Sequence, residues 1–142
     1  LVRFWIFQNN FSGKIPDWVG SLTNMEQFLA YDNSFSGYIP TTIGNLRQLE
    51  SLDLSHNFLQ GSIPDQVYDI TSLERLILTD NTLSGDLSLR IGGLTGLTDL
   101  WLNFNSFQGE IPSEISELAN LKNVLIESNN FNGTIPDVSN ME

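Results

Sequence analysis

The chain lacks cysteine, has few basic residues and contains no long apolar run, and each absence excludes a class of function. Without cysteine it has no disulfide, no thiolate nucleophile and no cysteine-bound metal. Only 6 lysines and arginines stand against 17 aspartates and glutamates, a net charge of −11. Nucleic-acid binding requires a basic surface, so we expect no nucleic-acid partner. No apolar run reaches the roughly 18 residues of a membrane-spanning helix, so membrane contact is expected only through parts of the protein outside this sequence.

One phrase recurs along the chain at a fixed period. "NNFSGKIP" at 9–16 returns as "DNSFSGYIP", "HNFLQGSIP", "FNSFQGEIP" and "SNNFNGTIP". Its glycine recurs every 24 residues, and so does the asparagine four positions earlier, at Asn9, Asn33, Asn57, Asn81, Asn105 and Asn129. A fixed period of roughly 20–50 residues is typical of a solenoid, in which each repeat buries its apolar side against its neighbours.

Within each repeat the apolar residues predict a strand, a turn and a return segment. Leu52 and Leu54 stand two residues apart, and an apolar pair with the same spacing recurs in every repeat, which is typical of a strand with one buried face. The asparagine amide can donate and accept hydrogen bonds at the turn, and stacked repeats would align these amides in a ladder. We therefore predict one α/β domain over 1–142, with a parallel sheet and return segments that are irregular or 3-10 helical.

These motifs resemble the plant-specific class of leucine-rich repeats, whose 24-residue pattern is L-x-x-L-x-x-L-x-L-x-x-N-x-L-x-G-x-I-P. The resemblance covers essentially the whole chain in six repeats. It implies a solenoid with its parallel sheet on the concave face, as in the extracellular parts of receptor-like kinases and receptor-like proteins and in related algal proteins. Such domains are not catalytic, and they bind peptides, proteins, small hormones or glycans on the concave side.

Two features depart from the family pattern. Ser88 stands where the other repeats have proline, so its return segment is expected to be less constrained. The capping segments that normally begin and end such domains, often with paired cysteines, are also missing. We therefore expect this sequence to be an internal segment of a longer array.

The strand residues between the buried leucines are predicted to point to the concave surface. Their central columns are unusually apolar, with one aromatic cluster expected at each end and polar residues between them. Exposed aromatic side chains are typical of contact surfaces. The predicted partner-binding residues are Trp5, Phe7, Leu29, Tyr31, Asp53, His56, Ile77, Asp80, Trp101, Phe104 and Leu125.

A second column places His56 between Asp32 and Asp80 on neighbouring repeats. Neighbouring strands lie about 4.8 Å apart, so the three side chains could form a socket for a basic group, a pH-sensitive contact or a weak metal site. The simpler interpretation is three solvated polar side chains, and we favour it. We predict no metal site.

The sequence predicts binding rather than catalysis. Ser55 and His56 are adjacent, but adjacent strand residues splay apart, and the chain has no second histidine and no phosphate-binding loop. We predict no catalytic residue, no cofactor, and a protein or peptide partner recognised by a secreted or cell-surface protein. One alternative is a structural subunit packed permanently in a larger, membrane-associated assembly. Another is a glycan- or ice-binding protein, although the return segments lack the regular threonine ranks that ice binding requires.

Two N-x-S/T sequons occur, at Asn10 and Asn132. Both are candidate glycosylation sites if the chain is secreted.

Overall fold

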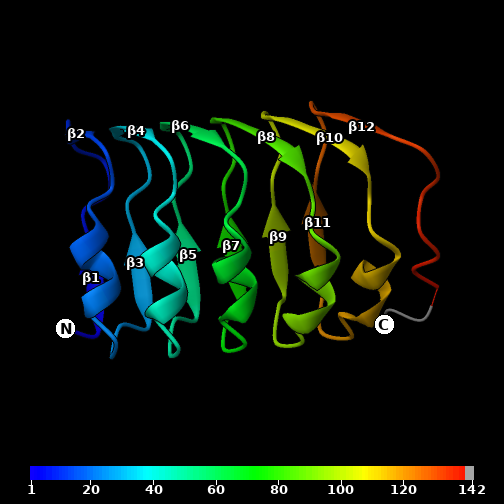
Figure 1. The fold of residues 1–142 in the computed structure, drawn as a ribbon, viewed down its shortest axis with the longest axis horizontal. Helices are drawn as coiled ribbons and strands as arrows, with labels where there is room; N and C mark the ends of the chain where they lie inside the picture. Colours follow the sequence, from blue (N-terminus) through cyan, green and yellow to red (C-terminus); the bar gives the residue numbers. More distant parts are fainter. Residues whose placement is uncertain (140–142) are drawn as a thin grey trace.

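The computed structural model describes residues 1–139 and shows stacked coils, each of which contributes one strand to a first parallel sheet (Figure 1). Neighbouring strands pair in register, so that Leu52 lies between Phe28 and Leu76. This arrangement confirms the predicted leucine-rich-repeat solenoid. The strands, in order across the sheet, are β1 (Arg3–Trp5), β3 (Gln27–Leu29), β5 (Ser51–Asp53), β7 (Arg75–Ile77), β9 (Asp99–Trp101) and β11 (Asn123–Leu125).

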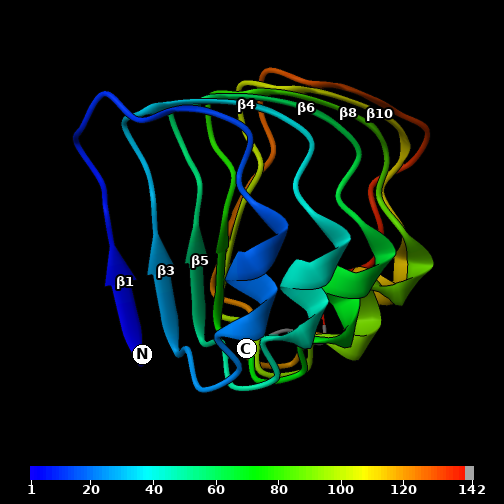
Figure 2. The same cartoon turned by 60° about the vertical axis from the view of Figure 1, so that its left-hand side comes forward.

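The return segments contain a second parallel sheet, which the sequence analysis did not predict. Each of its strands follows a ladder asparagine and pairs with the same segment of the next coil, and Figure 2 shows both sheets and the helices from the side. Its one inward column is apolar, with Phe35, Leu59 and Phe107 buried, while its other side chains, apart from the exposed Phe58, are small or polar. The strands are β2 (Ser12–Gly13), β4 (Ser34–Gly37), β6 (Phe58–Gly61), β8 (Thr82–Asp86), β10 (Ser106–Glu110) and β12 (Asn130–Asn132).

The first five coils each close through a short 3-10 helix, as the sequence predicted. A proline with φ between −78° and −58° and ψ between 137° and 144° precedes four of these helices, and its fixed φ carries the chain from strand to helix. Ser88 takes the same backbone conformation, φ −69° and ψ 142°, and its hydroxyl accepts a hydrogen bond from the Arg90 amide at 3.3 Å. This side-chain cap holds the geometry that proline provides elsewhere. The helices are η1 (Asp17–Ser21), η2 (Thr41–Asn45), η3 (Asp65–Asp69), η4 (Leu89–Gly93) and η5 (Ser113–Glu117).

The asparagine column forms a ladder of hydrogen bonds between coils. The Asn57 amide donates to Leu54 and Ser55 of its own turn, at 3.1 and 3.0 Å, and to Ala30 of the preceding coil at 3.1 Å. Its oxygen accepts from the Phe35 amide at 2.9 Å. One side chain, 6% exposed, thus pairs backbone groups that no strand partner reaches.

The third coil carries a bulky side chain where its neighbours have glycine. Gly44 lets η2 approach η3 closely, because a Cβ atom there would lie 2.5 Å from the Gln66 carbonyl oxygen. Gly20 and Gly92 stand at the equivalent positions of their coils, but the third coil has Tyr68, which is 3% exposed. Accordingly, η3 and η4 pack less extensively than the other neighbouring helices. Tyr68 therefore wedges these two coils apart.

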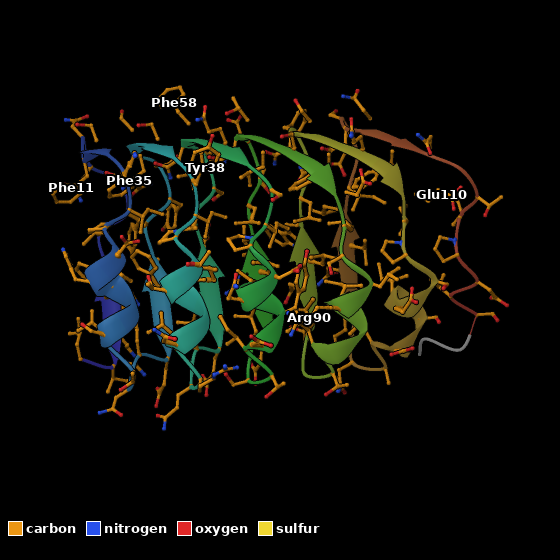
Figure 3. All side chains as sticks on the ribbon, in the orientation of Figure 1. Phe11, Phe35, Tyr38, Phe58, Arg90 and Glu110 are labelled. Carbon is orange, nitrogen blue, oxygen red and sulfur yellow. The ribbon has the colours of Figure 1, made fainter. Side chains whose placement is uncertain are left out.

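An arginine spans this widened junction. Arg90 of η4 donates to the Asp65 carbonyl oxygen at 3.0 Å and pairs with the Asp69 carboxylate, and Figure 3 shows it between η3 and η4. The Tyr68 hydroxyl makes no hydrogen bond of normal geometry within residues 1–139. Burial raises the pKa of Tyr68 to about 12, which the nearby Ser88 backbone opposes only in part.

Replacing Asn57 with alanine should lower the free energy of unfolding by about 3 kcal/mol, because buried amide and carbonyl groups lose their partners. Asn9 is the matched control, since it is exposed and donates only to Ile6 and Phe7 of its own turn. Asn9→Ala should lower the free energy by less than about 1 kcal/mol. Equilibrium urea unfolding measures both values, and equal losses would contradict the ladder's role.

Tyr68→Phe should raise the free energy of unfolding by about 1 kcal/mol, because it removes a buried, unpaired hydroxyl and keeps the wedge. The same urea experiment measures this change. A clear loss of stability would show instead that the hydroxyl is hydrogen-bonded in solution.

Candidate binding surface

The solvent-facing side of the first sheet, here called the first-sheet face, carries an amino-terminal aromatic cluster of Trp5, Phe7, Leu29 and Tyr31. The Phe7 and Tyr31 rings stack with centroids 4.5 Å apart and an interplanar angle of 5°. Trp5 is 52% exposed, and its indole N–H donates to Gln27 Oε1 at 3.2 Å. The structure thus brings these four predicted residues together on two adjacent coils.

A carboxy-terminal cluster on the same face consists of Trp101, Phe104 and Leu125. Trp101 and Leu125 pair across β9 and β11 and are half-buried, while Phe104 is 52% exposed. Ile77, which we expected in this exposed cluster, is only 3% exposed because it lies between Asp53 and Trp101 in the sheet register. Ile77 therefore supports its neighbours and offers almost no contact surface. The Trp101 indole N–H is buried with no acceptor within residues 1–139.

An acidic band of Asp32, Asp53 and Asp80 begins beside the amino-terminal cluster and continues toward the carboxy-terminal one. Asp53 is half-buried between Leu29 and Ile77, and it accepts hydrogen bonds from the Ser55 hydroxyl at 2.6 Å and the Ser55 amide at 3.0 Å. Burial raises the pKa of Asp53 above its usual value, and the Ser55 hydrogen bonds and the charge of Arg75 oppose this shift. The band therefore holds one carboxylate that is poorly solvated in the free protein.

The predicted column of Asp32, His56 and Asp80 forms only one of its two expected contacts. His56 Nδ1 lies 2.9 Å from Asp80 Oδ2, and both side chains are at least half exposed. No hydrogen bond or ion pair joins His56 to Asp32 within residues 1–139. The described part of the chain also holds no group of three or more acidic, histidine or cysteine side chains suited to a metal ion.

The residue before each ladder asparagine adopts a left-handed backbone, which the sequence analysis missed. Its φ lies between 52° and 56° in every coil, at Gln8, Asp32, His56, Asp80, Phe104 and Ser128. Aspartate and histidine tolerate this conformation, and their recurrence at this position was the available signal. Phe104 is different, because a bulky side chain is strained there. Phe104 thus carries an exposed aromatic ring on a left-handed backbone, a conformation that smaller polar residues adopt more easily.

Other exposed aromatic side chains lie away from the first-sheet face. Phe58 of β6 and Tyr38, just after β4, are each 61% exposed, and Trp18 of η1 is 56% exposed. Figure 3 shows Phe58 pointing outward from the second sheet. Their positions vary between coils, so the repeat pattern did not single them out. They provide internal controls for the first-sheet face.

The two sequons also lie outside the first-sheet face. Asn132 ends β12 and Asn10 precedes β2, and both are exposed. Their glycosylation stays a prediction. No helix of residues 1–139 is long and apolar enough to cross a membrane.

Comparison with known proteins places this geometry among repeat proteins. Residues 31–83 and residues 96–118 match family models described as leucine rich repeat. No curated protein matches the chain.

Solved structures of plant receptors share the fold. The ectodomain of the Arabidopsis thaliana receptor kinase GASSHO1/SCHENGEN3, in complex with CASPARIAN STRIP INTEGRITY FACTOR 2, is 37% identical with a TM-score of 0.92 over 94% of this chain. The Arabidopsis HAESA ectodomain, in complex with an N-terminally extended IDA peptide hormone, is 36% identical with a TM-score of 0.91 over 99% of this chain. The Arabidopsis BIR3–SERK2 complex is 35% identical, with a TM-score of 0.77 over 88% of this chain.

The chain spans 16% of the GASSHO1/SCHENGEN3 structure, 24% of HAESA and 66% of the chain matched in the BIR3–SERK2 complex. The coils, the asparagine ladder and these matches define a solenoid repeat protein. The chain belongs to the plant-type leucine-rich-repeat family.

Phe104→Asn should raise the free energy of unfolding by about 1 kcal/mol, because asparagine tolerates a left-handed backbone better than phenylalanine does. Phe58→Asn is the matched control, since Phe58 is similarly exposed but lies in a regular strand. The control should be neutral or destabilising. Urea unfolding of both variants tests this difference, and a loss of stability in Phe104→Asn would contradict the strain.

Proposed function

We propose that this chain is a non-catalytic recognition module that binds an extended peptide or protein segment on its first-sheet face. The observation that carries the proposal is the pair of aromatic clusters on one regular sheet. Tryptophan and tyrosine are the usual anchors of protein interfaces, because they combine large apolar area with little side-chain entropy. The parallel strands hold these anchors at fixed spacing, so a ligand meets a surface that is already ordered.

The size of the sheet suits a short peptide. Six strands at about 4.8 Å give a face roughly 28 Å across, which an extended peptide of about eight residues spans. Similar structures support this type of ligand, since HAESA is seen with a peptide hormone and BIR3 with SERK2. The first-sheet face is thus proposed to bind a peptide or a partner's extended segment.

An extracellular or cell-surface location fits this proposal. The similar structures named above include ectodomains of plant receptor kinases. Both sequons are exposed and lie near the second sheet, at opposite ends of the array. Glycans there would shield the second sheet and leave the first-sheet face open.

Selection of nine-residue peptides from an unbiased display library tests the proposal. Tyr31→Ala should lower the affinity of the selected peptides by at least about tenfold, because it removes an aromatic ring that stacks on Phe7 in the amino-terminal cluster. Phe58→Ala, at an equally aromatic but second-sheet position, should leave their affinity unchanged. Fluorescence anisotropy with dye-labelled peptides gives the dissociation constants. Peptides that respond only to Phe58→Ala, or a library without any binder, would overturn the proposed surface.

A further inference from the structure

The first-sheet face carries an excess of negative charge between its two aromatic clusters. Its two arginines have other partners: the Arg3 guanidinium lies 5.8 Å from the Trp5 ring centre, and Arg75, whose charge also acts on Asp53, pairs with Asp99 at 4.0 Å. Asp53 and Asp32 have no ion-pair partner within residues 1–139. The middle of the face is therefore electrostatically complementary to a cation.

Unused hydrogen-bonding capacity lies beside the same carboxylate. Ser51 precedes Asp53 by two residues on β5, so both side chains point to the first-sheet face. The Ser51 hydroxyl is buried in a residue only 7% exposed, and it has no hydrogen-bond partner within residues 1–139. Buried polar groups are normally paired. An unpaired hydroxyl two residues from the Asp53 carboxylate, on the same side of β5, is unused polar capacity in the middle of this face.

The spacing of the clusters fixes the pattern that a ligand must carry. Tyr31 follows β3 and Trp101 lies on β9, three strands further along the sheet, which is about 14 Å. An extended peptide covers this distance in about four residues. Side chains at i, i+2 and i+4 of such a peptide point to the same side. The middle one would lie over β5 and β7, where Asp53 and the residues before Asp80 are found.

We propose that the preferred occupant is an extended peptide in which a lysine or arginine stands between two apolar side chains, two residues from each. This inference rests on the proposed function and specifies its ligand. The apolar side chains pack on the two aromatic clusters, and the basic side chain pairs with Asp53 in the acidic band. A poorly solvated carboxylate gains more from a cation than an exposed one does, because less water must be removed when the pair forms.

Sequencing the peptides recovered from the display selection tests this pattern. We expect apolar–x–basic–x–apolar peptides to be enriched among binders that depend on Tyr31. The strongest such peptide is then synthesised with its basic residue intact, replaced by norleucine, or moved by one position so that it points to the opposite side. Each of the two altered peptides should bind about tenfold more weakly. Raising the salt concentration should weaken the parent peptide but not the norleucine peptide.

Asp53→Asn provides the matching change in the protein. Asparagine keeps the oxygen that accepts from Ser55 but removes the charge, so the parent peptide should lose about tenfold in affinity while the norleucine peptide is unaffected. Glu114→Gln, on η5 and away from the first-sheet face, is the charge-matched control and should change neither affinity.

The possible outcomes separate the two proposals. Peptides whose binding depends on Tyr31 but that show no enrichment of basic residues would overturn this inference. So would peptides whose affinity is unchanged by Asp53→Asn. Neither result would contradict binding on the first-sheet face. Peptides whose affinity is unchanged by Tyr31→Ala, or a library that yields no binding peptide, would overturn both the inference and the proposed function. Enrichment of acidic peptides would also overturn the inference, since the band would repel them.

Discussion

The hydrogen bonds of the ladder asparagines are the interaction on which the rest of this structure depends. Each coil turns sharply after its strand, which leaves backbone amides and carbonyls in the interior without a strand partner. The amide of Asn57 pairs such groups in its own turn and in the preceding coil. Because the same bonds recur in successive coils, all coils share one register, and the side chains of the first sheet form straight columns.

Because the core and the asparagine ladder stabilise the fold, the first-sheet face can carry residues that lower its stability. Phe104 holds a bulky ring on a left-handed backbone, and Asp53 holds a carboxylate among apolar neighbours, where burial raises its pKa. The apolar core and the ladder supply enough stability for both to persist. Both residues lower the stability of the fold and both lie on the first-sheet face. Unfavourable residues that persist on one face are typical of a binding surface.

The sequence was sufficient for the repeat, the register and the candidate face, because a fixed period places equivalent residues in columns. It was not sufficient for features that depend on contacts between coils. The second sheet arises from pairing of short segments with little strand pattern, and Ile77 is buried by neighbours in adjacent coils. Tyr68 stands at a glycine position, but only the close approach of η2 to η3 at Gly44 shows that the tyrosine must separate its coils. The left-handed residues before the ladder asparagines could be predicted in part from Asp32, His56 and Asp80, which are residue types that tolerate this conformation. Phe104 at the same position does not fit that pattern.

The most direct measurement of the central claim is a ligand titration followed through the indole N–H resonances of the three tryptophans. Trp5 and Trp101 lie in the two aromatic clusters, while Trp18, about as exposed as Trp5, lies on η1 outside the first-sheet face. A peptide selected on the chain should shift the Trp5 and Trp101 signals together, with one dissociation constant, and leave Trp18 in place. Movement of Trp18 while Trp5 and Trp101 stay fixed would contradict recognition on the first-sheet face.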